Sequence, residues 1–125
     1  MLSGMVNSVS PVSVTGGSSA ELYSDKYGED NYGFGQGLAF NAAANDNIAI
    51  GENTLSGTSG DATNNIAIGN DAAKSIGLGD NNIAMGKNSM ETAPTVEGYD
   101  NNIGIGYNSI KDAYDAATEN IVICV

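Results

Sequence analysis

One short motif recurs along the chain and limits the folds it can adopt. The motif Asn-Ile-Ala-Ile-Gly and its close variants occupy residues 47–51, 65–69, 82–86 and 102–106, with a half unit at 120–123 and a degenerate first copy at 31–36. The connecting segments differ in length, whereas the motif itself stays constant. A constant motif with variable connections predicts a solenoid, in which each repeat packs only against its neighbours.

Each motif predicts a short strand with one buried face. Ile48 and Ile50 alternate with Ala49, and a period of two residues is typical of a strand. Branched side chains favour strands, so we expect the large residues to fill the core. The predicted core-lining residues are Ile48, Ile50, Ile66, Ile68, Ile83, Met85, Ile103 and Ile105. The small residue between them is then expected to point outward, where it would let a neighbouring chain approach.

The residues after each strand predict a turn and a return segment. A glycine at the end of the strand suits a turn at which a Cβ atom would clash. The predicted turn glycines are Gly51, Gly69, Gly86 and Gly106. A second short strand is expected to follow, with an inward side chain supplied by Leu55, Ala73, Met90 or Ile110. The recurring asparagines are expected to stack from coil to coil and to form a hydrogen-bonded ladder.

These patterns predict an all-β chain, a parallel β-roll or β-helix of about six short coils. Much of the 41% hydrophobic content is alanine, tryptophan is absent and only two phenylalanines occur, so the core must be thin. Each coil would bury roughly three large apolar side chains at about 1.5–3 kcal/mol each, which barely offsets the loss of chain entropy. A single stack should therefore be marginally stable, and we expect a homotrimer.

Residues 1–30 do not match the repeats and are predicted to form an N-terminal attachment arm, with residues 31–125 as the repeat domain. Valines alternate with small polar residues around Pro11, which suggests an extended arm. The first six residues have no basic segment and no apolar run, and no stretch resembles a membrane span. We therefore expect synthesis in the host cytoplasm without a membrane anchor.

Charge and composition exclude several function classes. The net charge is −11, which repels phosphate backbones and anionic lipids, so neither nucleic acid nor membrane is an expected partner. Histidine is absent, which excludes Ser-His-Asp triads, Cys-His pairs and histidine-ligated metals. No enzyme activity and no cofactor are expected. Cys124, the single cysteine, lies in an apolar run and is expected to be a small buried side chain.

Five acidic residues fall shortly before a repeat and are expected at one corner of successive coils: Asp46, Asp61, Asp80, Asp100 and Glu119. The favoured interpretation is a solvated edge that discourages strand pairing. A row of carboxylates is also compatible with Ca²⁺ binding, and paired carboxylates with glycoside hydrolysis. No metal site is predicted, because the chain has no Asp-x-Asp-x-Asp-Gly loop.

The repeats resemble two related groups of proteins. The Asn-Ile-Ala-Ile-Gly units are similar to the head repeats of trimeric autotransporter adhesins, and Gly106-Tyr107-Asn108-Ser109 resembles segments of bacteriophage tail-fibre and virion surface proteins. The resemblance covers roughly residues 31–123 and implies a left-handed parallel β-roll packed as a trimer. Because the sequence shows no signal peptide, stalk heptads or anchor of an adhesin, a virion protein is favoured.

The resemblance therefore suggests a capsid decoration (cement) protein on the outer surface of a bacteriophage head, bound to the major capsid protein through the arm. The alternative is a short tail fibre, a spike or an adhesin-like module that binds host surface glycans. Exposed tyrosines can stack on sugars or partner proteins, although packing beneath the loops is the favoured interpretation of their positions. The possible partner contacts are Val6, Val9, Val12, Val14, Tyr99, Tyr107 and Tyr114.

Overall fold

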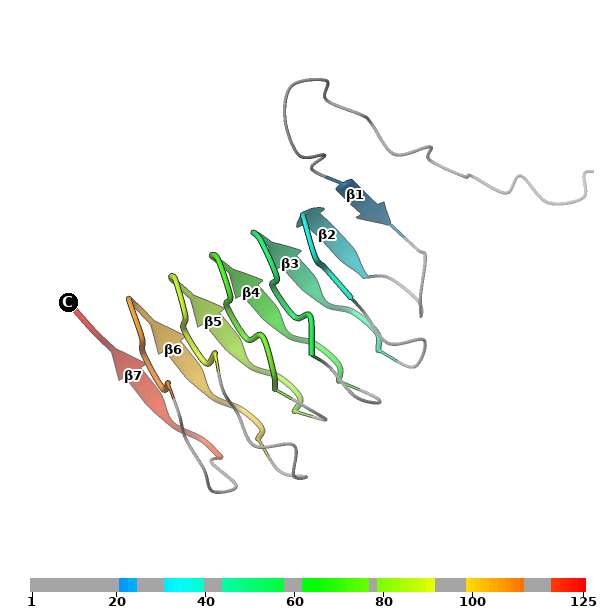
Figure 1. Cartoon of the computed structure of the whole chain (residues 1–125). Helices are drawn as coiled ribbons and strands as arrows, with labels where there is room; N and C mark the ends of the chain where they lie inside the picture. Colours follow the sequence, from blue (N-terminus) through cyan, green and yellow to red (C-terminus); the bar gives the residue numbers. More distant parts are fainter. Residues whose placement is uncertain are drawn as a thin grey trace, which may run out of the picture.

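The computed structural model describes residues 21–24, 31–39, 44–57, 62–76, 79–91, 99–111 and 118–125. These residues contain seven strands: β1 (Glu21–Ser24), β2 (Tyr32–Gly35), β3 (Ile48–Ile50), β4 (Ile66–Ile68), β5 (Ile83–Met85), β6 (Ile103–Ile105) and β7 (Ile121–Ile123). No helix occurs among the described residues. From each strand the chain turns back toward the base of the next strand, so the strands stack in sequence order (Figure 1).

The stack is a parallel sheet in exact repeat register. Strands β2 to β7 all run in the same direction, and Ile48 lies opposite Ile66 as Ala49 lies opposite Ala67. Equivalent residues of every motif therefore form columns that run along the stack. The predicted all-β parallel solenoid is confirmed, and the degenerate first copy at 31–36 takes its place in the sheet as β2.

The two ends of the sheet differ. Strand β1 pairs with β2 in the antiparallel direction, with Leu22 opposite Phe34, so residues 21–24 of the predicted arm belong to the sheet. Residues 1–20 and 25–30, which make up the rest of that arm, lie outside the described residues. Strand β7 forms the other end, and the C-terminus lies beyond the tip of its arrow (Figure 1).

An asparagine ladder joins the coils at the base of the strands. Asn65 is representative: its Nδ2 donates to Asn47 Oδ1 at 3.1 Å and to the Gly79 carbonyl at 2.8 Å, and its backbone N–H donates to the same Asn47 oxygen at 2.9 Å. The ladder consists of Asn31, Asn47, Asn65, Asn82, Asn102 and Asn120. The first five are buried, so these bonds satisfy polar groups that would otherwise be costly to bury.

The turn glycines stand where neighbouring coils approach most closely. Gly51, Gly69, Gly86 and Gly106 have φ values of 138°, 135°, 129° and 115°, a region that L side chains rarely adopt. A Cβ atom built on Gly69 would lie 2.5 Å from the Gly86 carbonyl oxygen in the next coil. Both the backbone conformation and the spacing between coils therefore require glycine at this corner.

The structure corrects the predicted core face of the strands. Ala49, Ala67 and Ala84 are fully buried, whereas the large residues on either side of them point away from the core. The prediction that the large residues line the core is wrong for all eight: Ile48, Ile50, Met85 and Ile105 are exposed, and Ile66, Ile68, Ile83 and Ile103 are half-buried.

The interior is too narrow for large residues on the strands. Side chains of the return segment already fill it: the Ser89 hydroxyl donates to the Gly104 carbonyl at 2.9 Å and lies 2.8 Å from the Ser109 hydroxyl. A Cβ atom on Gly104 would lie 3.2 Å from the terminal carbon of Met90 and 3.0 Å from both serine oxygens. Only alanine or glycine fits between the strand and the return segment.

The return segment begins with a turn, and the second strand that the sequence predicted is absent from the described residues. Its backbone enters the left-handed region twice in each of the coils of β3 to β6, as at Asn53 (φ 52°) and Leu55 (φ 51°). Leu55, Ala73 and Met90 nevertheless point inward as predicted, and Ile110 packs against them. The buried apolar core consists of Leu38, Ala49, Leu55, Ala67, Ala72, Ala73, Ile76, Ala84, Met90 and Tyr99.

Enlarging the inward residue of a central strand should destabilise the coil. Ala67→Leu places three extra carbon atoms where the return segment leaves no room, and overpacking of this kind costs about 1–3 kcal/mol. We expect the urea midpoint of unfolding to fall accordingly.

Lys87→Leu is the matched control, because it introduces the same side chain at an exposed corner. Exposed substitutions usually change stability by less than about 0.5 kcal/mol. Equal stabilities of the Ala67→Leu variant and the native protein would contradict the narrow interior.

Candidate assembly interface

The outward face of the parallel sheet carries an unbroken apolar surface, which we call the ridge. It consists of two columns of large side chains, one from the first and one from the third position of each strand. The first column is Tyr32, Ile48, Ile66, Ile83, Ile103 and Ile121, and the second is Phe34, Ile50, Ile68, Met85, Ile105 and Ile123. At about 4.8 Å between strands, six strands make the ridge roughly 24 Å tall.

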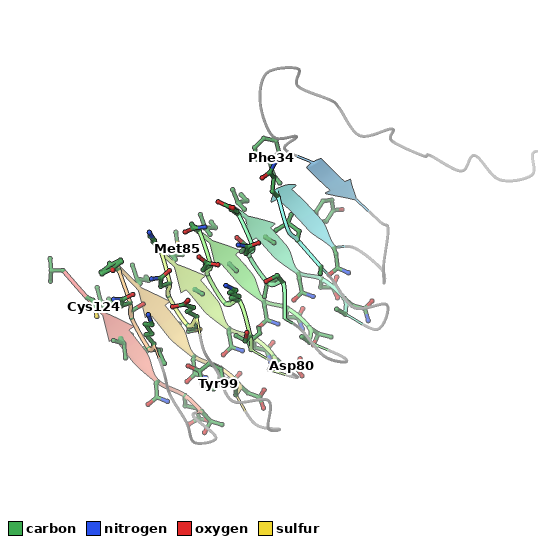
Figure 2. All side chains as sticks on the ribbon, viewed as in Figure 1. Phe34, Asp80, Met85, Tyr99 and Cys124 are labelled. Atoms are coloured by element: carbon green, nitrogen blue, oxygen red, sulfur yellow. The ribbon has the colours of Figure 1, made fainter. Side chains whose placement is uncertain are left out.

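The ridge exposes much of its apolar surface. Tyr32, Phe34 and Ile50 are 57%, 49% and 43% exposed, and all twelve members are either exposed or half-buried. Isolated exposed apolar residues are ordinary, but a contiguous apolar face of this size marks an interaction site. Phe34 and Met85 lie toward the same ends of their strands, which fits their common column (Figure 2).

Polar residues begin immediately beyond the turn glycines. Glu52, Lys87 and Tyr107 occupy equivalent places on this corner and are exposed. Asn70, in the same column, donates from Nδ2 to Glu52 Oε2 at 3.4 Å. The ridge therefore has a polar border, which is the usual arrangement of an apolar interface core and its rim.

Four members of the ridge were missing from the residues that the sequence singled out: Tyr32, Phe34, Ile121 and Ile123. The repeat register contains them, because they align with the isoleucines of the complete motifs. A further signal was available in the middle position, which is always Ala or Gly from β2 to β6, whereas the flanking positions accept Ile, Met, Phe or Tyr. A strict limit on size indicates a confined environment, so the middle position is the one inside.

The predicted acidic row does not form. Asp46 and Glu119 immediately precede the ladder asparagine, in the column that Asn64, Asn81 and Asn101 occupy in the other coils, all with positive φ. Asp80 and Asp100 lie one residue earlier, in a separate column, and Asp61 lies outside the described residues.

The carboxylates of Asp80 and Asp100 hold neighbouring coils together. Asp80 Oδ1 accepts from the Thr63 backbone N–H at 2.7 Å and from its hydroxyl at 3.0 Å, and Asp100 Oδ1 accepts from the Asp80 backbone N–H at 2.9 Å. Within the described ranges, no group of three His, Cys, Asp or Glu side chains could hold a metal ion. The acidic corner is thus a set of coil-to-coil hydrogen bonds.

A second polar column lies at the turn after the glycines. Asn53 Nδ2 donates to Asp71 Oδ1 at 3.3 Å, and Asn88 Nδ2 donates to Asn108 Oδ1 at 3.1 Å. The hydrogen bond from Lys74, at 3.0 Å, lowers the pKa of Asp71. These contacts are exposed or partly exposed, so they fix the turn geometry more than they stabilise the fold.

The predicted partner contacts divide into three groups. Tyr107 is 65% exposed, whereas Tyr99 is fully buried in the core, so the prediction that Tyr99 contacts a partner is wrong. Tyr114 and the four arm valines, Val6, Val9, Val12 and Val14, lie outside the described residues. Cys124 is exposed at the end of β7, which corrects the expectation that it is buried (Figure 2).

Comparison of the sequence with known protein families, with curated proteins and with solved structures gave no match. In the described part of the chain, no helix has the length and apolar character required to span a membrane. The proposed function therefore rests on the ridge.

Tyr99 supplies a test of the core. Its hydroxyl is buried and has no hydrogen-bond partner among the described residues, and burial raises its pKa to about 12. Because burial disfavours the charged phenolate in the folded protein, ionisation of this group does not weaken the fold below pH 10, and stability falls as the pH rises from about 10 to 12. Tyr99→Phe should remove this alkaline dependence, which melting temperatures measured across that range will show.

At neutral pH the same substitution should leave stability unchanged or slightly increased, because it removes an unsatisfied buried hydroxyl. Tyr107→Phe is the control, because it removes the hydroxyl of an exposed tyrosine outside the core. A large loss of stability in Tyr99→Phe at pH 7 would mean that the hydroxyl has a partner.

Proposed function

We propose that this chain is a non-enzymatic structural protein that assembles as a homotrimer through the ridge and decorates the outer surface of a bacteriophage-like virion. The observation that carries the proposal is the ridge itself. Twelve large apolar side chains lie outside a core built mainly from alanine and a few larger residues. A chain with this distribution gains more from burying its outer face than from its own interior.

Association through the ridge is also compatible with the acidity of the chain. The net charge of −11 opposes contact between copies in general, but the ridge contains no charged residue. Two or more copies can therefore meet at this face without placing like charges in contact. The resemblance to trimeric head repeats favours three copies around a central axis, with the ridges facing inward.

The virion role rests on the resemblance to virion surface proteins and on the arm. Strand β1 lies at the end of the sheet farthest from β7 (Figure 1). In the proposed role, residues 1–20, which precede β1 in the sequence, anchor this end in a shell while the coils stand outward. The net negative charge would keep the protein soluble at its high local concentration on such a shell.

Ile68→Asp should dissociate the trimer. In the assembly the substitution brings three carboxylates together at the apolar centre, where unpaired charges are strongly unfavourable. We expect light scattering to show monomers where the native protein shows trimers. Because binding stabilises the folded state, the native melting temperature should also rise with protein concentration, and that of the variant should not.

Tyr107→Asp makes the same kind of change on an exposed corner outside the ridge and should leave the trimer intact. A native protein that stays monomeric, with a melting temperature independent of concentration, would disprove association through the ridge.

The decoration role predicts a high copy number. On a stained gel of purified particles, the band of this protein should be comparable with that of the major shell protein. Deleting residues 1–20 should abolish binding to shells while the repeats remain folded, as judged by far-ultraviolet circular dichroism. Full occupancy by the truncated protein would show that the arm is not the anchor.

The exposed side chain of Tyr107 supports one alternative, a fibre or spike that binds host glycans. That role predicts only a few copies per particle and binding of the isolated protein to a glycan array. Loss of that binding in Tyr107→Ala, with the oligomer unchanged, would favour the fibre over the decoration protein.

A further inference from the structure

Strand β7 is the last strand of the sheet, and no described strand pairs with its outer edge, which we call the open edge. In every earlier coil the first strand residue donates its N–H to the following coil, as Ile103 does to the Asn120 carbonyl at 2.8 Å. The third residue accepts from the following coil, as the Ile105 carbonyl does from Cys124 N–H at 2.8 Å. By continuation of this pattern, the backbone groups of Ile121 and Ile123 face outward, and the described residues provide no strand to pair with them.

This edge is not built to receive another coil of the repeat. Cys124 stands where the other coils have the turn glycine, and it is not among the residues with positive φ. Val122 stands where the other coils have Ala or Gly. The tight corner and the narrow interior of a further coil both require the smaller residues, so continuation of the stack beyond β7 in the same parallel register is disfavoured.

The edge is nevertheless apolar and weakly charged. Ile121 and Ile123 are 71% and 67% exposed, more than any other isoleucine of the ridge, and Val122 is only half-buried. Glu119 is the single charged side chain in the segment 118–125 of a chain with a net charge of −11. Neither lysine nor proline protects this strand, although such residues commonly guard exposed edges.

We propose that β7 pairs with β7 of a second copy, antiparallel and centred on Val122, so that two assemblies join through their C-terminal ends. In this register Ile121 lies opposite Ile123 of the second copy, and both residues have their backbone groups directed to the open edge. Ile121 of each copy exchanges two hydrogen bonds with Ile123 of the other copy. These two residue pairs, one on each side of the centre, give four hydrogen bonds across the interface. The side chains of Ile121 and Ile123 stay on the ridge face, so the ridge continues from one copy into the other.

The pairing of β7 strands is compatible with the proposed trimer. The expected number of chains in the joined assembly rests on that trimer. The two-fold axis of the β7 pair runs perpendicular to the sheet, midway between Val122 of one copy and Val122 of the other. If the ridge faces the three-fold axis, that two-fold axis intersects it, and all three β7 strands can pair at once. The result is a closed assembly of six chains with an isologous contact, which does not propagate into a filament.

The tail pairing can be tested by removing one backbone donor. Ile123→Pro deletes an N–H that faces the open edge and keeps the in-chain bond from Cys124 N–H to the Ile105 carbonyl. Native mass spectrometry should show six chains for the native protein, at six times the chain mass of 12.7 kDa, and three chains for the variant. Ile123→Ala is the control, because it shortens the side chain, retains the N–H and should remain a hexamer.

The two proposals fail in different ways. Three chains in both the native protein and Ile123→Pro would overturn the tail pairing and leave the trimer standing. Two chains in the native protein and one in the variant would support the tail pairing and disprove the trimer. Polymers longer than six chains would overturn the tail pairing, because they require an unlike contact such as the arm of one copy on β7 of the next.

A disulfide tests the register directly. In the register centred on Val122, Cys124 lies opposite residue 120 of the second copy. These two residues form a non-hydrogen-bonded pair with Cα atoms ~4.5 Å apart, which is within the disulfide range. Asn120→Cys should therefore oxidise to a covalent dimer whose linked peptides join positions 120 and 124. In the native protein the two Cys124 residues would be about 13 Å apart, at ~3.3 Å per residue, and should not link. Absence of the 120–124 link in the variant would overturn the register.

Discussion

The asparagine ladder is the interaction on which the rest of the structure depends. Asn47, Asn65 and Asn82 each donate to the ladder asparagine before them and also to a carbonyl at the far end of their own loop, as Asn82 does to the Tyr99 carbonyl at 2.7 Å. A loop of any length can therefore separate two strands without shifting their register. This arrangement explains why the repeats keep an invariant asparagine although the spacing between them varies.

Register in turn determines what the inside of the solenoid can hold. Once coils stack at the spacing of a sheet, serine, threonine, leucine and methionine from the return segments occupy the space behind the strands. Only Ala or Gly remains possible on the inward side of β2 to β6, and the large residues must lie outside. The thin core and the long apolar ridge are both consequences of the spacing between coils.

The ends of the solenoid show how such a repeat avoids unlimited growth. At one end β1 reverses direction and covers the edge of β2, so a further parallel coil cannot join there. At the other end the departures from the motif at Val122 and Cys124 disfavour the next coil, and no described strand pairs with the outer edge of β7. An edge of this kind suits a symmetric partner better than continued stacking, because an antiparallel strand needs neither the tight corner nor the interior space.

Much of the fold could be read from the residues alone. The motif and its spacing predicted parallel coils, the asparagine ladder, the turn glycines and the inward positions of Leu55, Ala73 and Met90. The orientation of the strands was predicted wrongly, because a period of two separates the faces of a strand without stating which is buried. That choice depended on the return segment, whose side chains fill the interior and leave no space for isoleucine. The position of Tyr99 in the core and the hydrogen bonds of Asp80 and Asp100 likewise depend on neighbours in adjacent coils, which are distant along the chain and close only after it has folded.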